Sequence, residues 1–184
     1  AIDNSGIQFR VLNSSRGPAV RGPRAQADRD LYKNAVQNIL FNTGGLSIIE
    51  ASVEDIIVEN NIVKGLILDN LSKIYSNSVV LTTGTFLRGL IRIGKKQFPA
   101  GRIGEKPSIN LAKRIEALKF SIGRLKTGTP PRIHKKSINF NHLEEQLPDE
   151  NPAPFSFINR FINIPQVSCF ISHTNLNTHK IIKK

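Results

Sequence analysis

The stretch from Val79 to Gly89 constrains the fold of this chain most, and it reads Val-Val-Leu-Thr-Thr-Gly-Thr-Phe-Leu-Arg-Gly. A short β-branched, apolar run is typical of a strand covered on both faces of a sheet. Gly84 removes the Cβ where another group approaches the backbone, and Thr83 supplies a hydroxyl beside it. Because ligands bind at the carboxyl ends of strands in open α/β sheets, both are candidate ligand contacts. A core strand that ends in an ordinary glycine turn is the alternative.

Two β-rich runs precede this stretch. Residues 53–58 and 62–68 flank the adjacent asparagines Asn60 and Asn61, and asparagine tolerates a positive φ better than most residues. The pattern predicts a hairpin, followed by a third short strand near residues 73–75. A hairpin, a strand and a further strand ending in Thr-Gly resembles the end of the FAD-binding half of two-dinucleotide-binding flavoproteins.

Two helices are predicted. Apolar residues recur at helical spacing from Leu31 to Leu40, with Asp28 near the N-terminus of the helix. Ser108 is expected to cap a second helix, which carries apolar residues between 111 and 118.

The remaining segments are predicted from turn residues and short apolar runs. Residues 1–25 are expected to form loops with fixed bends, because they contain two Gly-Pro pairs. Residues 89–107 are expected to form an ordered loop over a site. Strands are predicted at 120–126 and 167–173, with a long polar excursion at 137–155.

Composition bounds the class of protein. The chain has 184 residues, begins with Ala1 and contains no methionine, so we expect a piece of a longer protein. The single Cys169 excludes an internal disulfide and fits a reducing compartment. No apolar run approaches the roughly 20 residues that span a bilayer, and no signal peptide opens the chain. The sequence therefore predicts a soluble, cytoplasmic protein with no membrane contact.

The formal net charge of +12 indicates a polyanionic partner, with nucleic acid the first candidate. A solvated surface without a partner is the alternative, and AT-rich coding would also raise the lysine content. The basic residues occur in three clusters: Arg10, Arg16, Arg21, Arg24 and Arg29; Arg88, Arg92, Lys95, Lys96, Arg102 and Lys106; Arg124, Lys126, Arg132, Lys135 and Lys136.

Several motifs are absent or incomplete. There is no Gly-x-Gly-x-x-Gly, so the pyrophosphate motif of a flavoprotein lies upstream of Ala1 or the flavin interpretation is wrong. The segment 89–96 nearly matches a P-loop, but Lys96 replaces the Ser/Thr that ligates magnesium. The four histidines have no zinc-ligand spacing with Cys169, which is interpreted as a buried, inert thiol in a strand rather than a nucleophile. No metal ligand and no catalytic residue is assigned.

Several segments together carry a family resemblance. The decapeptide ending at Arg132, Gly-Arg-Leu-Lys-Thr-Gly-Thr-Pro-Pro-Arg, is the most specific of them. The others are Ser5-Gly-Ile-Gln-Phe-Arg10, Gly17-Pro-Ala-Val20, Arg24-Ala-Gln-Ala-Asp-Arg29, Thr83-Gly-Thr-Phe86, Pro154-Phe-Ser-Phe157 and His173-Thr-Asn175. On these residues the chain is identified as a member of the tRNA uridine 5-carboxymethylaminomethyl modification enzyme family, MnmG or GidA, and as an internal part of it.

The resemblance implies an α/β fold, part of a glutathione-reductase-like, two-dinucleotide-binding FAD domain with an inserted α/β region. Residues 1–130 would be a partial FAD-binding domain that lacks its N-terminal glycine-rich motif. Residues 131–184 would be the truncated start of the inserted region. The fold would therefore be incomplete.

The family binds FAD, uses NADH, and works as a homodimer with the GTPase MnmE. Together they build an aminomethyl-type substituent on C5 of the wobble uridine of certain tRNAs, using a folate one-carbon unit. The resemblance implies that Val53 meets the adenine part of FAD through its backbone and that Ser108 lies at the same cofactor. Thr83 and Gly84 match the strand end that touches flavin in related folds. The catalytic loops have no counterpart, so this part alone is expected to hold FAD poorly and to be inactive.

Two other interpretations stay open. One is a related enzyme, the folate- and FAD-dependent tRNA methyltransferase, although the segment Lys126–Arg132 argues against it. The other is a non-catalytic, basic RNA-binding remnant.

Overall fold

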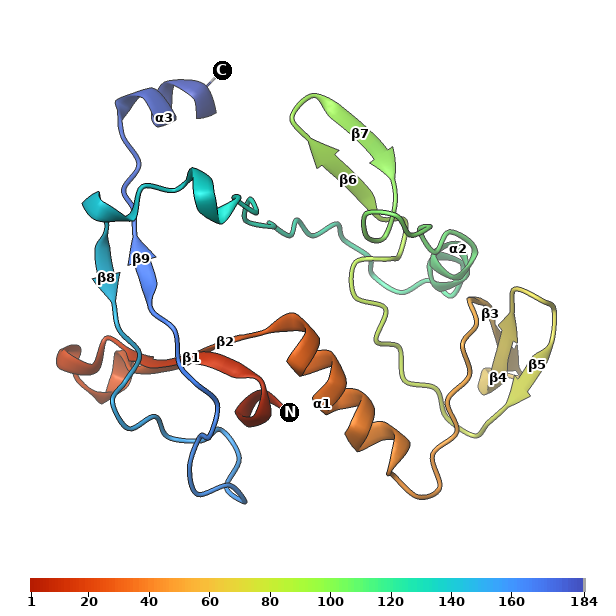
Figure 1. The fold of residues 1–184 in the computed structure, drawn as a ribbon. Helices are drawn as coiled ribbons and strands as arrows, with labels where there is room; N and C mark the ends of the chain where they lie inside the picture. The colour runs from red at the N-terminus through yellow and green to blue at the C-terminus, as the bar shows by residue number, and fades with distance from the viewer. Residues whose placement is uncertain (184) are drawn as a thin grey trace. The chain divides into compact units, whose positions relative to one another are not determined.

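The computed structural model describes residues 1–183, which form two compact units (Figure 1). Unit 1 contains residues 1–47 and the residues from Arg132 onward, and unit 2 contains Ile48–Pro131. The chain therefore leaves unit 1, builds unit 2 and returns. The sequence places residues 1–130 in a partial FAD-binding domain and residues 131–184 in an inserted region. That division refers to the domains of a longer protein, and it stays a prediction.

Unit 1 is built on two antiparallel strand pairs. Strands β1 (Gly6–Leu12) and β2 (Gly22–Ala27) form one pair, and β8 (Glu144–Gln146) and β9 (Cys169–Ile171) form the other. The prediction of loops throughout residues 1–25 is therefore wrong. The strand signal is obscured because β1 buries the polar Gln8 beside the apolar Phe9, at 0% and 2% exposure, so hydrophobicity does not alternate.

The helices of unit 1 begin at side-chain caps. Helix α1 spans Arg29–Phe41, and the Asp28 carboxylate accepts hydrogen bonds from the backbone N–H groups of Asp30 and Leu31, both at 3.0 Å. These bonds satisfy two of the free donors at the helix start and confirm the predicted helix. Helix α3 (Leu176–Ile182) begins in the same way at Asn175.

Unit 2 contains the predicted hairpin and its third strand. Strands β3 (Val53–Glu59), β4 (Ile62–Leu68) and β5 (Lys73–Tyr75) form one antiparallel sheet in that order. Asn60 and Asn61 turn the chain with φ values of 51° and 62°, which confirms the prediction from their tolerance of this conformation.

The core of unit 2 lies between this sheet and helix α2 (Asn110–Ala117). Leu111 and Ala112 of the helix are 4% and 6% exposed, and Ile56 and Leu68 of the sheet are 7% and 6% exposed. The Arg114 guanidinium crosses from α2 to β3, where Nε lies 3.0 Å from the Asp55 carboxylate.

A second hairpin of unit 2 replaces the predicted loop over residues 89–107. Strands β6 (Leu90–Ile93) and β7 (Lys96–Pro99) pair through a two-residue turn in which Gly94 has φ 57°. The remaining described elements are five single-turn 3₁₀ helices, at Ile2–Asn4, Ser14–Arg16, Pro18–Val20, Lys135–Ser137 and Phe140–His142.

Two predicted strands do not form. Residues 79–83 and 120–126 have no strand partner among residues 1–183, and Val80 and Leu125 are 84% and 96% exposed. A strand exists only where a neighbour pairs with its backbone, and an apolar run does not supply that neighbour. The predicted strand over 167–173 does form, as the shorter β9, because β8 pairs with it.

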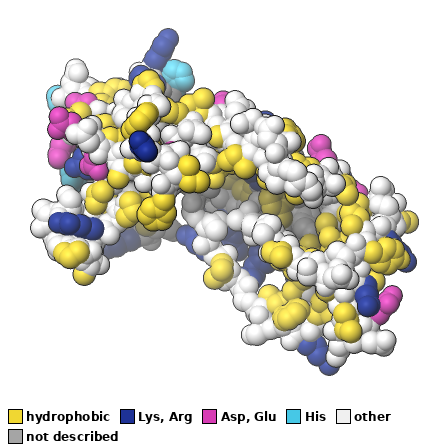
Figure 2. Space-filling model, turned by 90° about the horizontal axis from the view of Figure 1, so that it is seen from below, with side chains coloured by type: hydrophobic (Ala, Val, Ile, Leu, Met, Phe, Trp, Pro, Cys, Tyr) yellow, Lys and Arg dark blue, Asp and Glu magenta, His cyan; other side chains and the backbone are white. Residues whose placement is uncertain are grey.

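Apolar exposure is a general feature of both units. Figure 2 shows hydrophobic side chains over much of the visible face, interleaved with lysine and arginine. Each unit thus presents apolar surface that its own elements do not cover.

Candidate functional site

Thr83 and Gly84 lie in a turn rather than at a strand end. The Phe86 backbone N–H donates to the Thr83 carbonyl at 3.2 Å, and Gly84 has φ 55°. A Cβ at Gly84 would meet nothing within 4 Å, so no close contact within this chain requires glycine at this position. The left-handed backbone of Gly84 is what favours glycine. The prediction that these residues end a sheet strand is therefore corrected to a turn.

Ser108 is positioned by backbone pairing. Its N–H donates to the Phe86 carbonyl at 2.8 Å, and its carbonyl accepts from the Arg88 N–H at 3.0 Å, which makes a parallel bridge with Leu87. The predicted helix cap is wrong, because the cap position is Ile109 and no side chain bonds there. Ser108 lies one residue before that position, with its backbone already engaged.

A hollow of about 440 Å³ in unit 2 has Ser108 in its wall. Its wall is formed by Ser52, Glu54, Asp69, Phe86, Glu105, Lys106, Pro107 and Ser108. The Asn110 amide donates to the Glu54 carboxylate at 2.6 Å, which ties the start of β3 to the start of α2 beside this hollow. The volume lies within the range of pockets that hold small molecules.

Of the four predicted cofactor residues, one lines this hollow and one lies beside it. Val53 lies at the start of β3, between the lining residues Ser52 and Glu54, and Ser108 lines the hollow directly. Thr83 and Gly84 are on the segment that continues into Phe86, but they do not line it. Val53 belongs to the three-stranded sheet, whereas Ser108 pairs with Leu87 in an isolated bridge outside that sheet.

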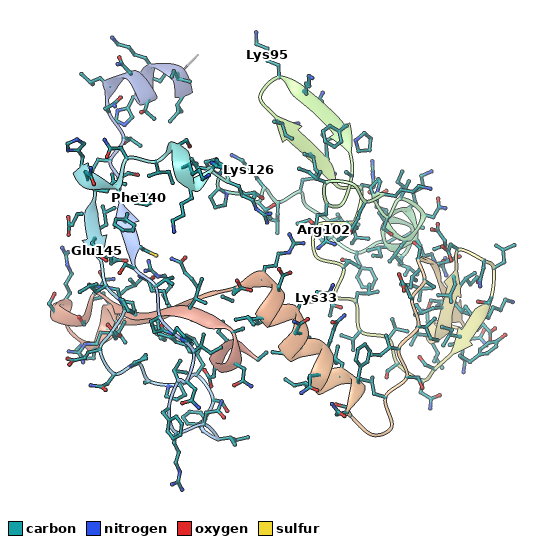
Figure 3. The ribbon with its side chains drawn as sticks, viewed as in Figure 1. Lys33, Lys95, Arg102, Lys126, Phe140 and Glu145 are labelled. Atoms are coloured by element: carbon teal, nitrogen blue, oxygen red, sulfur yellow. The ribbon has the colours of Figure 1, made fainter. Side chains whose placement is uncertain are left out.

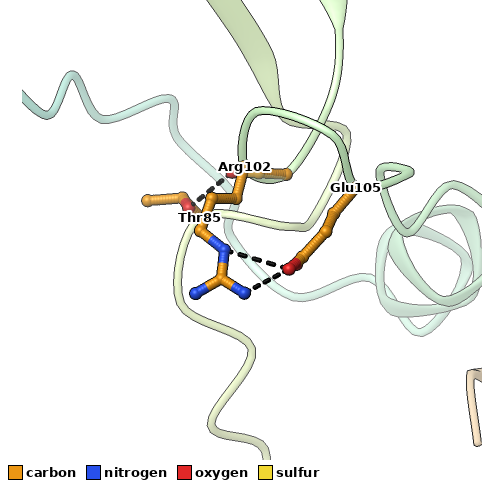
Figure 4. A network of polar contacts seen from close by, with 4 residues as sticks. Thr85, Arg102 and Glu105 are labelled. Carbon is orange, nitrogen blue, oxygen red and sulfur yellow. Dashed lines mark hydrogen bonds and ion pairs between the residues drawn. The ribbon is translucent and has the colours of Figure 1, made fainter. Parts of the chain in front are cut away.

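Carboxylates dominate the charge of the hollow. Glu54, Asp69 and Glu105 face one lysine, Lys106. Arg102 holds Glu105 through an ion pair, with Arg102 Nε 3.0 Å from the carboxylate oxygen, as Figure 4 shows. Carboxylates accept hydrogen bonds from amino and hydroxyl groups and repel phosphates.

A close approach fixes one wall of the hollow. A Cβ at Gly101 would lie 2.0 Å from the Phe86 ring, so only glycine leaves room for Phe86 at this position. The Thr85 hydroxyl donates to the Gly101 carbonyl at 2.9 Å and holds the same two segments together (Figure 4). Sequence reasoning missed Glu54, Asp69 and Phe86 as lining residues, because they lie in separate segments that only the fold brings together.

The basic residues after the Thr-Gly-Thr segment separate into two groups. Arg88 and Arg102 form ion pairs with Glu116 and Glu105. Arg92, Lys95 and Lys96 are exposed on the β6–β7 hairpin and form no ion pair with any residue in 1–183. Figure 3 shows Lys95 at the tip of this hairpin, directed away from the ribbon.

The remaining candidates give no site. Cys169 lies half-buried in β9, where its thiol donates to the Gln8 side chain at 3.1 Å. Residues 1–183 contain no group of three metal-ligating side chains, and none of their helices has the length and hydrophobicity to span a membrane.

These elements define a mixed α/β segment with a hollow beside its three-stranded sheet. The family model described as glucose inhibited division protein A matches residues 1–184, and the chain belongs to that family.

Relatives agree along the whole chain. The tRNA uridine 5-carboxymethylaminomethyl modification enzyme MnmG of Granulibacter bethesdensis is 55% identical over 186 residues, which cover 100% of this chain and 30% of that protein. Two crystal forms of Aquifex aeolicus GidA each give a TM-score of 0.90 at 41% identity, covering 99% of this chain and 31% of theirs. The chain thus spans about a third of the length of these relatives.

Proposed function

We propose that this chain is a segment of an FAD-dependent enzyme that modifies the wobble uridine of tRNA. The match of the family along residues 1–184 carries the proposal, and the name of the Granulibacter relative, a tRNA uridine modification enzyme, supplies the substrate class. The segment belongs, on this proposal, to a two-dinucleotide-binding FAD domain with an inserted α/β region.

Within that enzyme the hollow beside β3 holds the adenosine end of FAD. The Val53 backbone offers adjacent donor and acceptor groups to the adenine edge, and Ser108 offers a hydroxyl. The carboxylates of Glu54 and Asp69 suit the adenine amino group and the ribose hydroxyls, which are neutral donors. The same charge is unfavourable for a pyrophosphate, which requires a glycine-rich turn at a helix N-terminus outside these residues.

FAD reduced by NADH would supply the redox chemistry that attaches the one-carbon unit to C5 of the uridine. The residues of this chain bind and orient the cofactor, and none is assigned to the chemical step. The proposed partners are tRNA, a GTPase of the MnmE type and a second copy of the full-length protein, in the cytoplasm.

Nucleoside analysis of tRNA tests the proposal. Cells that lack the gene are expected to lose the (carboxymethyl)aminomethyl substituent from the wobble uridine, and the full-length gene is expected to restore it. Loss of a 5-methyl group elsewhere in tRNA, with the wobble uridine intact, would instead support the related folate-dependent methyltransferase. Unchanged nucleosides together with retained tRNA binding would indicate the basic RNA-binding remnant.

A further inference from the structure

Two arginines of unit 1 lie directly opposite each other in a strand pair. In the β1–β2 ladder Arg10 pairs with Arg24, and Gln8 pairs with Gln26. Because side chains alternate along a strand, these four residues share one face of the pair. Like charges directly opposite each other destabilise a sheet unless something compensates them.

The protein holds both guanidinium groups with neutral acceptors only. Arg24 Nη2 donates to the side-chain oxygens of Gln8 and Gln146, both at 2.8 Å, and Arg10 Nη1 donates to the Leu147 carbonyl. Neither arginine forms an ion pair with any residue in 1–183. Gln8 is 0% exposed, so the acceptor that positions Arg24 is fixed within the fold.

Further donors of the pair are unused. Arg24 Nε is buried without a hydrogen-bond partner, so the desolvation of this guanidinium is not compensated by the protein. Arg24 Nη1 and Arg10 Nη2 make no hydrogen bond to residues 1–183 and are not among the buried unpaired atoms. They are therefore not fully buried, while another nitrogen of each guanidinium is anchored.

We propose that Arg10 and Arg24 form a binding site for a phosphate group, which supplies the missing negative charge between them. Guanidinium nitrogens donate strong hydrogen bonds to phosphate oxygens, and a guanidinium that is already hydrogen-bonded in the protein loses less side-chain freedom on binding. An ordinary solvated arginine pair would separate the two charges, whereas here neutral acceptors hold both side chains on one face of the strand pair. On the proposed function the group is a backbone phosphate of the tRNA; a free phosphate is the other source.

Two variants of the full-length protein and one control test the site. Arg24→Gln removes the anchored guanidinium. Arg10→Gln is expected to leave the fold intact, because it removes only one hydrogen bond, from Arg10 to a backbone carbonyl. Arg16→Gln is the matched control, because this exposed arginine lies on the same segment and makes no side-chain hydrogen bond within residues 1–183.

The first arm measures thermal unfolding in inorganic phosphate against chloride at equal ionic strength. Phosphate should raise the unfolding midpoint of the wild type and of Arg16→Gln, and the rise should be lost in Arg10→Gln and in Arg24→Gln. Equal responses of all four proteins would overturn the site. This arm requires no RNA, so it decides the site even if the protein modifies no tRNA.

The second arm titrates tRNA at several salt concentrations. If the bound phosphate belongs to tRNA, Arg10→Gln should lower the slope of log affinity against log salt by about 1 more than Arg16→Gln does. A phosphate response with an unchanged slope would overturn the tRNA source and support a free phosphate. A wild type that binds phosphate but no tRNA would contradict the proposed function and leave the phosphate site supported.

Discussion

Asp3 shows how one buried charge can fix a distant loop. It is 5% exposed, and its carboxylate accepts from the backbone N–H groups of Phe155 and Ser156 at 2.8 and 3.0 Å and from the Asn159 amide at 2.8 Å. Burial by itself raises the pKa of Asp3, but these hydrogen bonds to the ionised form outweigh it and lower the pKa below the ordinary value of 3.8. The loop at 155–159 is therefore held by a carboxylate that favours its charged state.

The pH dependence of stability follows from this lowered pKa. Because the folded state holds the proton less tightly than the unfolded state, the stabilisation is complete above the unfolded pKa of about 4 and is lost as the pH falls through the folded pKa. Asp3→Asn should lower the free energy of unfolding by about 1–3 kcal/mol at neutral pH, because it removes charged hydrogen bonds. Urea unfolding between about pH 6 and pH 3 measures both effects.

The control for this prediction is the exposed Asp30→Asn, which should leave the acid sensitivity unchanged. An Asp3→Asn protein as sensitive to acid as the wild type would contradict the assigned role of Asp3.

Substitutions at Gly84 can show whether glycine is needed for its backbone conformation or for the space that a ligand occupies. Its φ of 55° favours glycine, and asparagine tolerates that conformation far better than valine does. If the flavin needs the space beside Gly84, both Gly84→Val and Gly84→Asn should reduce FAD occupancy in the full-length protein. The measurement is visible flavin absorbance per purified protomer. Full occupancy in Gly84→Asn with loss in Gly84→Val would make Gly84 a turn residue only.

At the scale of elements, the β6–β7 hairpin is the best candidate for contact with RNA phosphates outside unit 1. Lys95 and Lys96 are exposed at its turn, and neither forms an ion pair within residues 1–183. Lys95→Ala/Lys96→Ala should weaken tRNA binding by the full-length protein. It should also reduce the slope of log affinity against log salt by about 2, because fewer counterions are released on binding when phosphate contacts are lost. Titrations at several salt concentrations give the slope.

Lys64→Ala/Lys73→Ala is the matched control for the hairpin, because it removes two exposed lysines from the β3–β4–β5 sheet of the same unit. If both double variants reduce the slope equally, the effect is that of net charge, and the hairpin has no particular role.

At the scale of the whole molecule, the chain covers about a third of the length of its relatives and exposes apolar side chains on both units. We expect residues 1–184, expressed alone, to hold less FAD than the full-length protein and to modify no tRNA. The reason is that the hollow offers groups for adenosine and no glycine-rich turn for the pyrophosphate. Flavin content and nucleoside analysis, compared at equal protomer concentration, measure the difference. Stoichiometric flavin on residues 1–184 would contradict the prediction.

The sequence by itself determined the elements whose signal is local. The Asp28 cap, the Asn60-Asn61 turn and the apolar face of α2 each act within a few residues, so they predict α1, the β3–β4 hairpin and the buried Leu111. The family was also legible in the sequence, because its motifs are continuous segments.

Tertiary structure decided everything that depends on a distant partner. Residues 79–83 have the composition of a strand but remain unpaired. The polar Gln8, in contrast, is buried because the Gln146 carbonyl and the Arg24 guanidinium satisfy its hydrogen bonds. The opposition of Arg10 and Arg24 depends on the register of two strands, and the hollow near Val53 and Ser108 depends on segments far apart in the chain. Strand pairing and side-chain burial each depend on two segments, so the composition of one segment alone does not predict them.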